Sequence, residues 1–301
     1  MKDLTVGITT RNRPAAVARC VESLRVLAPL ESPILVFDNA SDPPVTPALG
    51  SELPAGLAVT IIRDPSAGYI GGRNRMVREA TTPYILLLDD DAVVFSAAAV
   101  ASAMTVMERD PSVAAVGFAQ AEADGRPWPE AMQPGRGLEP ACVSAYIGFA
   151  HLLRREVFVR LGGYRENFVF YGEEKDYCVR VLAAGLRVVY LPGALVGHVP
   201  DPAGRNATRY VRFVIRNDCL YSLYNEPWPI VAVSLPLRFW RYRRMKAQAG
   251  AESGGVRWIL NEIGRELPDV WRNRHAISWA TLREWRRLAR TVVPYAAGSR
   301  A

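Results

Sequence analysis

Three adjacent carboxylates, Asp89, Asp90 and Asp91, form the sharpest chemical feature of the sequence. They follow the apolar run Leu86–Leu88, so they stand at the end of a predicted buried strand. Side chains two residues apart in a strand point the same way, and Asp89 and Asp91 can therefore address one site. Hard divalent cations such as Mg²⁺ and Mn²⁺ relieve the repulsion between carboxylates and leave coordination positions for phosphate oxygens. The alternative is an acidic turn that caps the helix beginning near Ser96.

A second acidic cluster, Glu173, Glu174 and Asp176, begins a predicted helix after Tyr171 and Gly172. Glu173 and Glu174 are adjacent and cannot share a helix face, so one can point into a cleft while the other makes a structural contact. A carboxylate beside a metal–phosphate site is a natural general base for an alcohol. Taken alone, such a segment is more often a solvated helix start, and both interpretations stay open at this point.

Two further features could contribute to the same site. His198 follows the predicted apolar strand Leu186–Leu191; a lone histidine there is usually structural, and it becomes a candidate metal ligand only if carboxylates are nearby. His151 and His275 have no such support and are expected to be structural. The glycines of residues 66–74 could let the backbone approach a nucleotide, but their spacing matches neither the dinucleotide-binding nor the P-loop pattern.

The hydrophobic pattern predicts the scaffold that must position these residues. Apolar runs indicate strands at 4–9, 34–37, 57–63, 84–88 and 113–118. Helices are expected between them at 14–28, at 96–109, and in a segment that follows Gly68, Gly71 and Gly72 and ends at about 80. This alternation is typical of an α/β fold, with a mostly parallel sheet and helices on both faces. Ligands of such sheets bind outside the carboxyl ends of the strands, so Thr9, Asp38 and Asp89 to Asp91 should gather at one edge.

The remaining sequence predicts a two-part chain. Residues 119–140 are polar and rich in Gly and Pro, as in an insertion or a flap, and 142–200 form a second α/β stretch. We expect an α/β domain at 1–205, in two halves at about 1–118 and about 119–205. Residues 206–301 are expected to form a basic, Trp-rich helical region.

The net charge of +7 over 301 residues hides a strong asymmetry. Residues 202–301 hold 18 basic and 7 acidic side chains and six of the seven tryptophans, whereas residues 1–201 carry a balance of −4. With 50% hydrophobic and 22% charged residues, the composition excludes a disordered or collagenous chain. An acidic front joined to a basic back suggests two roles in one chain.

The basic third contains a candidate membrane contact at residues 227–246. Residues 227–237 are apolar but too short to span a bilayer, and Pro236 is expected to break them. Arginines interleaved with aromatic residues follow, which favours a peripheral contact with an anionic membrane. The alternative is that the tryptophans pack a helical subdomain or a homodimer interface. No nucleic-acid module is recognisable, so we expect no nucleic-acid partner.

The cysteines and the N-terminal residues indicate the compartment. The four cysteines form no CxxC pair, which is typical of reduced thiols in a cytoplasmic protein, and no secretory h-region follows Met1. We therefore expect a cytoplasmic protein with peripheral contact at the inner face of the cytoplasmic membrane. The scattered cysteines are Cys20, Cys142, Cys178 and Cys219.

As a set, the motifs over residues 4–225 resemble the family-2 glycosyltransferases of GT-A fold. Residues 6–13 are similar to the family's first strand and Thr-x-Asn-Arg turn, 37–42 to its second-strand motif, 71–74 to its glycine-rich segment, and 89–91 to its DxD position. The resemblance implies an inverting transferase that binds a nucleotide-sugar donor. The implied donor-binding residues are Thr9, Arg11, Asp38, Gly72, Arg73, Asn74, Asp89 and Asp90.

Residues 161–168 and 171–176 resemble the family signature that ends in a Glu-Asp pair, and the catalytic base of that pair falls on Glu174. The resemblance further implies that Asp89, Asp91 and His198 hold Mn²⁺ or Mg²⁺. Arg216-Asn217 resembles a pair common in the rhamnosyl- and galactofuranosyl-transferase branch. Glu174 is one methylene longer than the usual Asp, and Ser66 stands where the family has Asn.

The implied activity is the transfer of one sugar from a UDP- or dTDP-linked donor to a hydroxyl of a saccharide or lipid-linked acceptor, in polysaccharide or glycolipid assembly. The Gln-x-x-Arg-Trp motif of processive synthases is absent, which favours single-sugar addition. One alternative is a phosphohydrolase with Asp89 as an aspartyl-phosphate nucleophile, since residues 86–93 fit that pattern. Such enzymes need a downstream lysine, and only Lys175 and Lys246 are available. Another alternative is an inactive, membrane-docked binding module.

Overall fold

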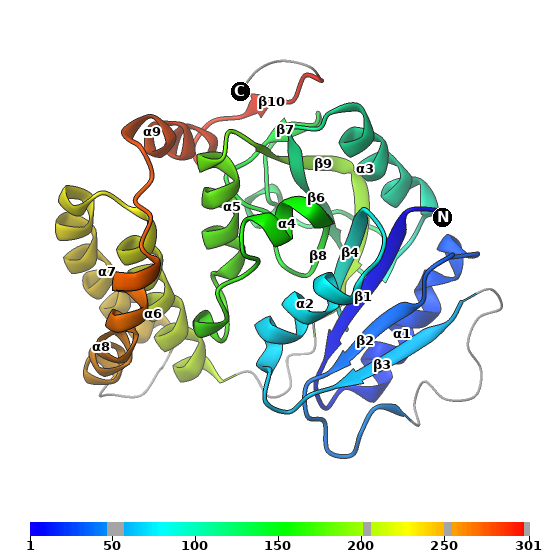
Figure 1. Cartoon of the computed structure of the whole chain (residues 1–301), viewed down its shortest axis with the longest axis horizontal. Helices are drawn as coiled ribbons and strands as arrows, with labels where there is room; N and C mark the ends of the chain where they lie inside the picture. Colours follow the sequence, from blue (N-terminus) through cyan, green and yellow to red (C-terminus); the bar gives the residue numbers. More distant parts are fainter. Residues whose placement is uncertain (47–56, 201–205, 250–254, 298–301) are drawn as a thin grey trace.

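A single mixed sheet organises the chain in the computed structural model, which describes residues 1–46, 57–200, 206–249 and 255–297 (Figure 1). Its strands lie in the order β10-β7-β9-β6-β8-β4-β1-β2-β3, and β5 pairs with β9 outside this path. The strands are β1 Leu4–Thr10, β2 Ile34–Asp38, β3 Val59–Arg63, β4 Tyr84–Asp89, β5 Ala92–Val94, β6 Val113–Ala121, β7 Ala141–Cys142, β8 Ala150–Arg154, β9 Arg187–His198 and β10 Val293–Pro294.

The strand pairing brings the predicted site residues to one edge. β3, β2, β1 and β4 are parallel neighbours, with Thr10 opposite Asp38 and Thr9 opposite Asp89. β8 runs antiparallel to both β4 and β6, and β6 is parallel to β9. The antiparallel β5–β9 pair places Ala92 opposite His198, directly after the acidic turn. The predicted α/β fold with a mixed, mostly parallel sheet is confirmed.

Helices cover both faces of the sheet, as predicted. Ile34 and Val36 of β2 share a core with α1 and α3, whereas Leu35 and Phe37 share the opposite core with α2, α4 and α5. This alternation along one strand is what a sheet buried on both sides requires. The helices are α1 Pro14–Ser23, α2 Gly68–Glu79, α3 Ala97–Arg109, α4 Arg155–Arg160, α5 Glu173–Ala183, α6 Ala207–Asn225, α7 Trp228–Ala249, α8 Gly255–Asn273 and α9 Trp279–Leu288, with 3₁₀ turns η1 Leu24–Leu27, η3 Glu130–Met132 and η4 Glu166–Phe168.

The glycines at 68, 71 and 72 lie inside α2, and the prediction that they precede the helix is wrong. A Cβ atom on Gly72 would overlap the Phe37 ring of β2, so glycine allows this helix to lie close against the sheet. The glycine is therefore explained by helix–strand packing in the structure.

The C-terminal helices share a core with the sheet. Val231, Val270 and Trp285 belong to the same buried cluster as Phe168 and Tyr177, and β10 adds an antiparallel strand to β7. α6 packs against both α7 and α8 (Figure 1). The division at about residue 205 stays a prediction.

The prediction that Pro236 breaks its segment is wrong, because α7 continues through this residue. Proline removes the N–H that would bond the Ala232 carbonyl, and both residues are exposed, so that carbonyl faces the solvent side of the helix. Among the helices that the structure describes, none is both long and apolar enough to cross a bilayer.

Candidate active site

The three carboxylates of the acidic turn face different partners. β4 ends at Asp89, and Asp90 and Asp91 form the turn into β5, so the prediction that Asp89 and Asp91 share one strand is wrong. Asp90 is buried and accepts hydrogen bonds from Thr10 Oγ1 at 2.7 Å and from Arg13 Nη1 at 2.9 Å. Burial raises the pKa of Asp90 to about 6 despite the nearby Arg13 charge.

Asp91 and His198 approach each other across the β5–β9 pair. Asp91 Oδ1 lies 3.7 Å from His198 Nε2, and within the described residues this buried oxygen has no hydrogen-bond partner. Burial, followed by the charge of Asp89, raises the pKa of Asp91. A buried carboxylate oxygen facing an imidazole nitrogen is an arrangement that suits a shared cation.

The His198 ring is held on three sides. Its Nδ1 bonds Gln120 Oε1 at 2.6 Å, and the ring stacks between Trp128 and Phe149 at centroid distances of 5.1 and 4.6 Å. A fixed Nδ1 bond orients Nε2 toward the candidate metal, as outer-shell partners of metal-binding histidines do. The histidine lies at the end of β9, and the prediction that its strand stops at Leu191 is wrong.

The residues that the structure places at this site fit Mn²⁺ or Mg²⁺ held jointly with a substrate. No group of three His, Cys, Asp or Glu side chains within the described ranges is arranged to hold an ion alone. Asp91 and His198 can supply two ligands, and phosphate oxygens of a donor can supply others, as is usual for Mg²⁺. Asp89, the third predicted ligand, points its Oδ1 at Arg73 and Tyr69, at 2.6 and 3.1 Å.

Arg73 joins the acidic turn to the N-terminus of α5. Its fully buried guanidinium donates to Asp89 Oδ1 at 2.6 Å and to Glu173 Oε1 at 3.3 Å, and its Nη1 lies 3.7 Å from Glu174 Oε1. It also donates to the Gly148 carbonyl at 2.6 Å. The two clusters singled out in the sequence therefore meet at one buried cation.

Glu174 and Glu173 differ in access. The Glu174 side chain is 18% exposed, whereas that of Glu173 is 1% exposed. The Glu174 carboxylate lies against Gly148, where a Cβ atom would overlap Oε1. Burial raises the pKa of Glu174, and burial together with the Glu174 charge raises the pKa of Glu173 well above its ordinary range. Of the two, the geometry favours Glu174 as the carboxylate that can meet a substrate.

The turn before α5 is held by the Arg216-Asn217 pair of α6. Asn217 Nδ2 donates to the carbonyls of Phe168, Phe170 and Tyr171 at 2.8, 2.7 and 2.6 Å. Val169 and Tyr171 have φ values of 63° and 67°, which are strained for such residues. The amide therefore stabilises an otherwise unfavourable turn that leads into Glu173 and Glu174.

The other predicted donor-binding residues lie near this edge but differ in access. Asp38 is fully buried and accepts from the Ser41 N–H at 2.8 Å, so its carboxylate holds the loop after β2. Thr9 is buried, and its Oγ1 has no hydrogen-bond partner among the described residues. Arg11 is exposed, and Asn74 Nδ2 donates to the Tyr164 carbonyl at 2.9 Å.

Gln120 and Trp128 had no role in the sequence-based prediction, and Arg13 entered it only as part of a motif. Arg13 lies 3.3 Å from Asp91 Oδ2, and its place in the Thr-x-Asn-Arg turn was the available signal. Gln120 and Trp128 contact His198 from the segment predicted as an insertion or flap. Nothing in their spacing indicates a histidine some 70 residues further along the chain.

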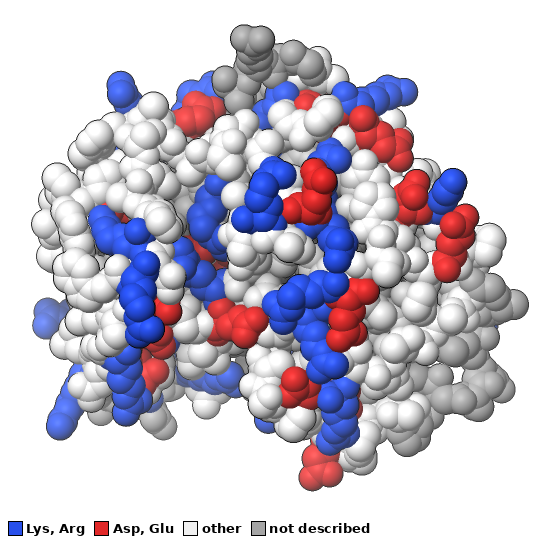
Figure 2. Space-filling model, in the orientation of Figure 1, with Lys and Arg blue, Asp and Glu red and all other residues white. Residues whose placement is uncertain are grey.

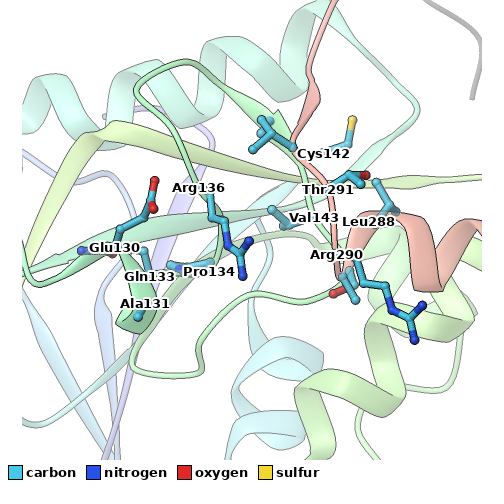
Figure 3. A pocket seen from close by; sticks show the side chains of 15 residues that line it. Glu130, Ala131, Gln133, Pro134, Arg136, Cys142, Val143, Leu288, Arg290 and Thr291 are labelled. Atoms are coloured by element: carbon cyan, nitrogen blue, oxygen red, sulfur yellow. The ribbon is translucent and has the colours of Figure 1, made fainter.

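A pocket of about 230 Å³ lies apart from these residues, between the 130–136 loop and residues 288–292 after α9 (Figure 3). Arg136 and Arg290 line it, but none of the predicted site residues does. We therefore place the candidate active site at the strand edge rather than in this pocket.

Known proteins resemble this chain in sequence and in fold. A family model described as Glycosyl transferase family 2 matches residues 5–179. Pre-mycofactocin glycosyltransferase from Mycobacterium tuberculosis is 29% identical over 211 residues, a match that covers 65% of this chain and 43% of the relative. The chain thus spans less than half the length of that curated relative.

Solved structures share the fold at low identity. The mannosyltransferase PcManGT from Pyrobaculum calidifontis, in complex with GDP-Man and Mn²⁺, has a TM-score of 0.56 at 16% identity, covering 95% of this chain and 83% of its own. GalNAc-T7 with UDP, GalNAc and Mn²⁺ has a TM-score of 0.58 at 17% identity, covering 88% and 57%. S. aureus TarS with UDP-GlcNAc has a TM-score of 0.55 at 14% identity, covering 74% and 67%.

At these identities the structural similarity establishes the fold alone. The assignment of the chain to a family rests on the family model. The matched region is more than half of the chain and contains the acidic turn, Arg73 and Glu174. The predicted family resemblance is confirmed: this chain belongs to glycosyl transferase family 2.

Proposed function

We propose that the protein transfers one sugar from a nucleoside-diphosphate sugar to an acceptor hydroxyl with inversion at the anomeric carbon. Donors with UDP or dTDP fit the proposal, and the Arg216-Asn217 resemblance favours a deoxysugar or a furanose. The nucleotide sugars bound in the structural neighbours, GDP-Man and UDP-GlcNAc, support a donor of this class. The acceptor is a saccharide or a lipid-linked saccharide of polysaccharide or glycolipid assembly.

The donor is proposed to bind at the carboxyl ends of β1, β2 and β4. The register places Thr9 beside Asp89 and Thr10 beside Asp38, so one nucleotide can lie across all three strands. Exposed Arg11 can approach its phosphates, and the unpartnered Thr9 hydroxyl can bond to it. Asp38, Gly72, Arg73, Asn74, Asp89 and Asp90 complete the proposed donor-binding set.

Asp91 and His198 are proposed to hold Mn²⁺ or Mg²⁺, with Asp89 as the further predicted ligand. When bound, such an ion supplies positive charge that stabilises the departing diphosphate. Gln120 keeps His198 in the orientation that presents Nε2 toward Asp91. Mn²⁺ is present in two of the structural neighbours, which supports a divalent cation.

Glu174 is proposed to act as the general base. Its carboxylate takes the proton of the acceptor hydroxyl while that oxygen forms a bond to the anomeric carbon. The bond between the anomeric carbon and the diphosphate breaks on the opposite face, and its electron pair leaves with the diphosphate. Arg73 binds Asp89 and approaches Glu174, so it keeps the donor edge and the base at a fixed separation.

The main support for this function is that the acidic turn and the partly exposed Glu174 meet at buried Arg73. Only one of the two adjacent glutamates reaches a surface from which an acceptor can approach. The test is Glu174→Gln, which keeps the side-chain size but cannot accept the proton. Turnover with a donor identified by binding should fall at least ~10²-fold, with donor affinity nearly unchanged.

The matched control is Glu156→Gln, which changes an exposed carboxylate of α4 and should keep normal turnover. Near-normal turnover of Glu174→Gln would contradict the assignment and move the base to Glu173 or Asp176.

The partners of the C-terminal region belong to the same proposal. We propose peripheral membrane contact through residues 227–246, at the inner face of the cytoplasmic membrane, which would bring the enzyme to a lipid-linked acceptor. A homodimer is the alternative use of this surface. In the proposed division, residues 1–118 bind the nucleotide, 119–205 the acceptor, and 206–301 the membrane.

The two other functions considered are not favoured. A phosphohydrolase would use Asp89 as a free nucleophile, whereas Asp89 Oδ1 accepts from Arg73 and Tyr69. An inactive binding module would have no need of the buried Arg73 network or the strained turn before Glu174.

A further inference from the structure

The solvent-exposed face of α7 is apolar over its first half. From Trp228 to Trp240, every exposed position carries an apolar side chain. Val233 is 63% exposed, and Leu237 and Trp240 are each 58% exposed. A surface helix normally turns polar residues to water, so this face is inverted. Its members are Trp228, Pro229, Ala232, Val233, Pro236, Leu237 and Trp240.

Positive charge follows directly on the same helix. α7 contains five basic residues and no acidic residue. Arg243 and Arg244 are exposed, and the Arg244 guanidinium lies 5.0 Å from the Trp240 ring centroid. Figure 2 shows basic side chains on the side of the molecule where α7 and α8 lie, and others over the centre of the same face.

α8 also carries a row of exposed apolar residues. Val256, Leu260, Gly264, Leu267 and Trp271 are all exposed and recur at spacings of three and four residues, which places them on one helix face. Trp271 is 70% exposed. These residues therefore form a second outward-facing apolar stripe.

The acidic residues of α8 turn the other way, toward α6. Glu266 bonds Arg216 at 2.8 Å, Glu262 lies 3.8 Å from the same guanidinium, and Asp269 accepts from the Tyr224 hydroxyl at 2.5 Å. Arg257 and Arg272 remain exposed on the outer side. The outward surface of α8 is thus apolar and basic, because its acidic side chains contact residues of α6.

The two stripes meet at one end, because α7 and α8 both lie on α6 and run antiparallel. The Trp228 and Trp271 rings lie 5.9 Å apart at one end, and the Tyr242 hydroxyl lies against Gly255 at the other. Both helices pack on α6, which leaves their other sides outward. Trp228 and Trp271 belong to the two apolar stripes, so the stripes join into one surface.

We propose that α7 and α8 together form a membrane face that lies in the headgroup region of an anionic phospholipid bilayer. The proposal extends the contact proposed for residues 227–246 to a second helix. It rests on the proposed function in one respect, which is that docking would bring the site to a lipid-linked acceptor. Apolar and aromatic side chains enter the interface while flanking arginines meet anionic headgroups. Charge complementarity selects this occupant over a second copy, because two such basic surfaces would repel each other.

This face is tied directly to the base-bearing helix. Asp218 of α6 bonds Arg241 of α7 at 2.7 Å and Lys175 of α5 at 2.8 Å, and Lys175 adjoins Glu174. Docking of α7 and α8 would therefore hold Glu174 at a set distance from the bilayer. A lipid-linked acceptor would present its hydroxyl at that surface.

The test is sedimentation of the full chain with phosphatidylcholine vesicles, with and without phosphatidylglycerol, at low and high salt. We expect binding to the anionic vesicles at low salt. Leu260→Ser/Leu267→Ser/Trp271→Ser on α8 and Val233→Ser/Leu237→Ser/Trp240→Ser on α7 should each weaken it at least about tenfold. All six residues are exposed, so folding should be preserved, which circular dichroism checks.

The matched control replaces three apolar residues exposed elsewhere, Val26→Ser/Leu138→Ser/Val159→Ser, and should bind vesicles normally. Full binding by the α8 variant would overturn the two-helix face, as would equal binding to neutral and anionic vesicles. A lipid-free dimer that the same variants dissociate would assign the surface to a second copy instead. Because transfer to a soluble acceptor is measured separately, lost transfer with intact vesicle binding contradicts the proposed function alone.

Discussion

Glu174 differs from its neighbour Glu173 in the property that a general base needs, which is access to the acceptor. Both carboxylates lie near Arg73, but only Glu174 retains an exposed edge. Glu173 is buried and accepts a hydrogen bond from Arg73, which anchors the first turn of α5. In the proposed mechanism, the pair combines one reactive carboxylate, Glu174, and one positioning carboxylate, Glu173.

The raised pKa of Glu174 predicts an acid limb in the pH profile of turnover. Burial disfavours the carboxylate, so its pKa lies above the ordinary value near 4.3. The base is active when deprotonated, and turnover should therefore fall as the pH drops through this raised pKa. Measurement of kcat against pH at saturating donor checks this, with circular dichroism as a control for folding. An acid limb at the ordinary glutamate pKa would contradict it.

Gly148 should be sensitive to the addition of a single methyl group. A Cβ atom there would overlap Glu174 Oε1, so Gly148→Ala should displace the carboxylate and lower kcat by about tenfold or more. Gly193→Ala is the matched control, because in the described part of the chain its added Cβ would meet nothing within 4 Å beyond its own chain neighbours. Equal turnover in both variants would show that the position of Glu174 against Gly148 is irrelevant.

Sequence motifs identified the charged candidate site residues, but they did not identify the residues that orient them. Asp91, His198 and Glu174 were identified as candidates, and the structure places the first two 3.7 Å apart. Gln120 and Trp128 were missed because their role depends on the β6–β9 pairing, which brings distant residues together. Such long-range contacts leave no local spacing pattern.

At the scale of elements, the link between η4 and α5 is the most constrained part of the site. It contains two non-glycine residues with positive φ and reaches Glu173 directly after Gly172, whose φ is 87°. Asn217 of α6 supplies one amide to three of its carbonyls. The C-terminal helices thereby shape the turn that presents the base.

Asn217→Ala should test this support. Loss of the amide leaves the buried Phe168 carbonyl and two partly buried carbonyls without this donor, so the free energy of unfolding should fall by roughly 1–3 kcal/mol, and kcat should fall as well. Asn273→Ala is the control, since this exposed amide bonds only within α8, to Asp269 at 2.8 Å. Urea denaturation followed by circular dichroism measures both. If Asn217→Ala matched the control, the turn would owe its shape to other contacts.

The element pattern was predictable where periodicity is strong and failed where tertiary contacts decide. β1, β2 and β4 were expected close to their observed bounds. The glycines of α2 looked like a loop because Gly72 meets Phe37 only after the helix packs. Pro236 looked like a break because the exposure of the Ala232 carbonyl on the helix surface is not visible in the sequence.

At the scale of the whole molecule, the basic C-terminal region and the acidic N-terminal region share one hydrophobic core. Trp285 and Val270 belong to the cluster that contains Tyr177 of α5. β10 pairs with β7, and Asp218 bridges α5 to α7. The charge asymmetry seen in the sequence therefore does not imply two independently packed units.

This shared core predicts a single cooperative unfolding transition. Six of the seven tryptophans lie in residues 202–301, so fluorescence reports mainly on that region, whereas far-ultraviolet circular dichroism reports on the whole chain. The two signals should give the same urea midpoint. A fluorescence midpoint well below that of circular dichroism would show that the C-terminal region unfolds separately.

The central claim is that the edge around Asp91 and His198 binds a nucleotide-sugar donor together with a divalent cation. Calorimetric titration of the full chain with UDP-GlcNAc, UDP-galactofuranose, dTDP-rhamnose and GDP-mannose, in Mn²⁺ and in EDTA, tests it most directly. At least one donor should bind in Mn²⁺, and EDTA or Asp91→Asn should weaken that binding at least about tenfold. Asp124→Asn, which changes an exposed carboxylate, should bind normally. Binding that persists unchanged in EDTA and in Asp91→Asn, or no binding of any donor, would contradict the account.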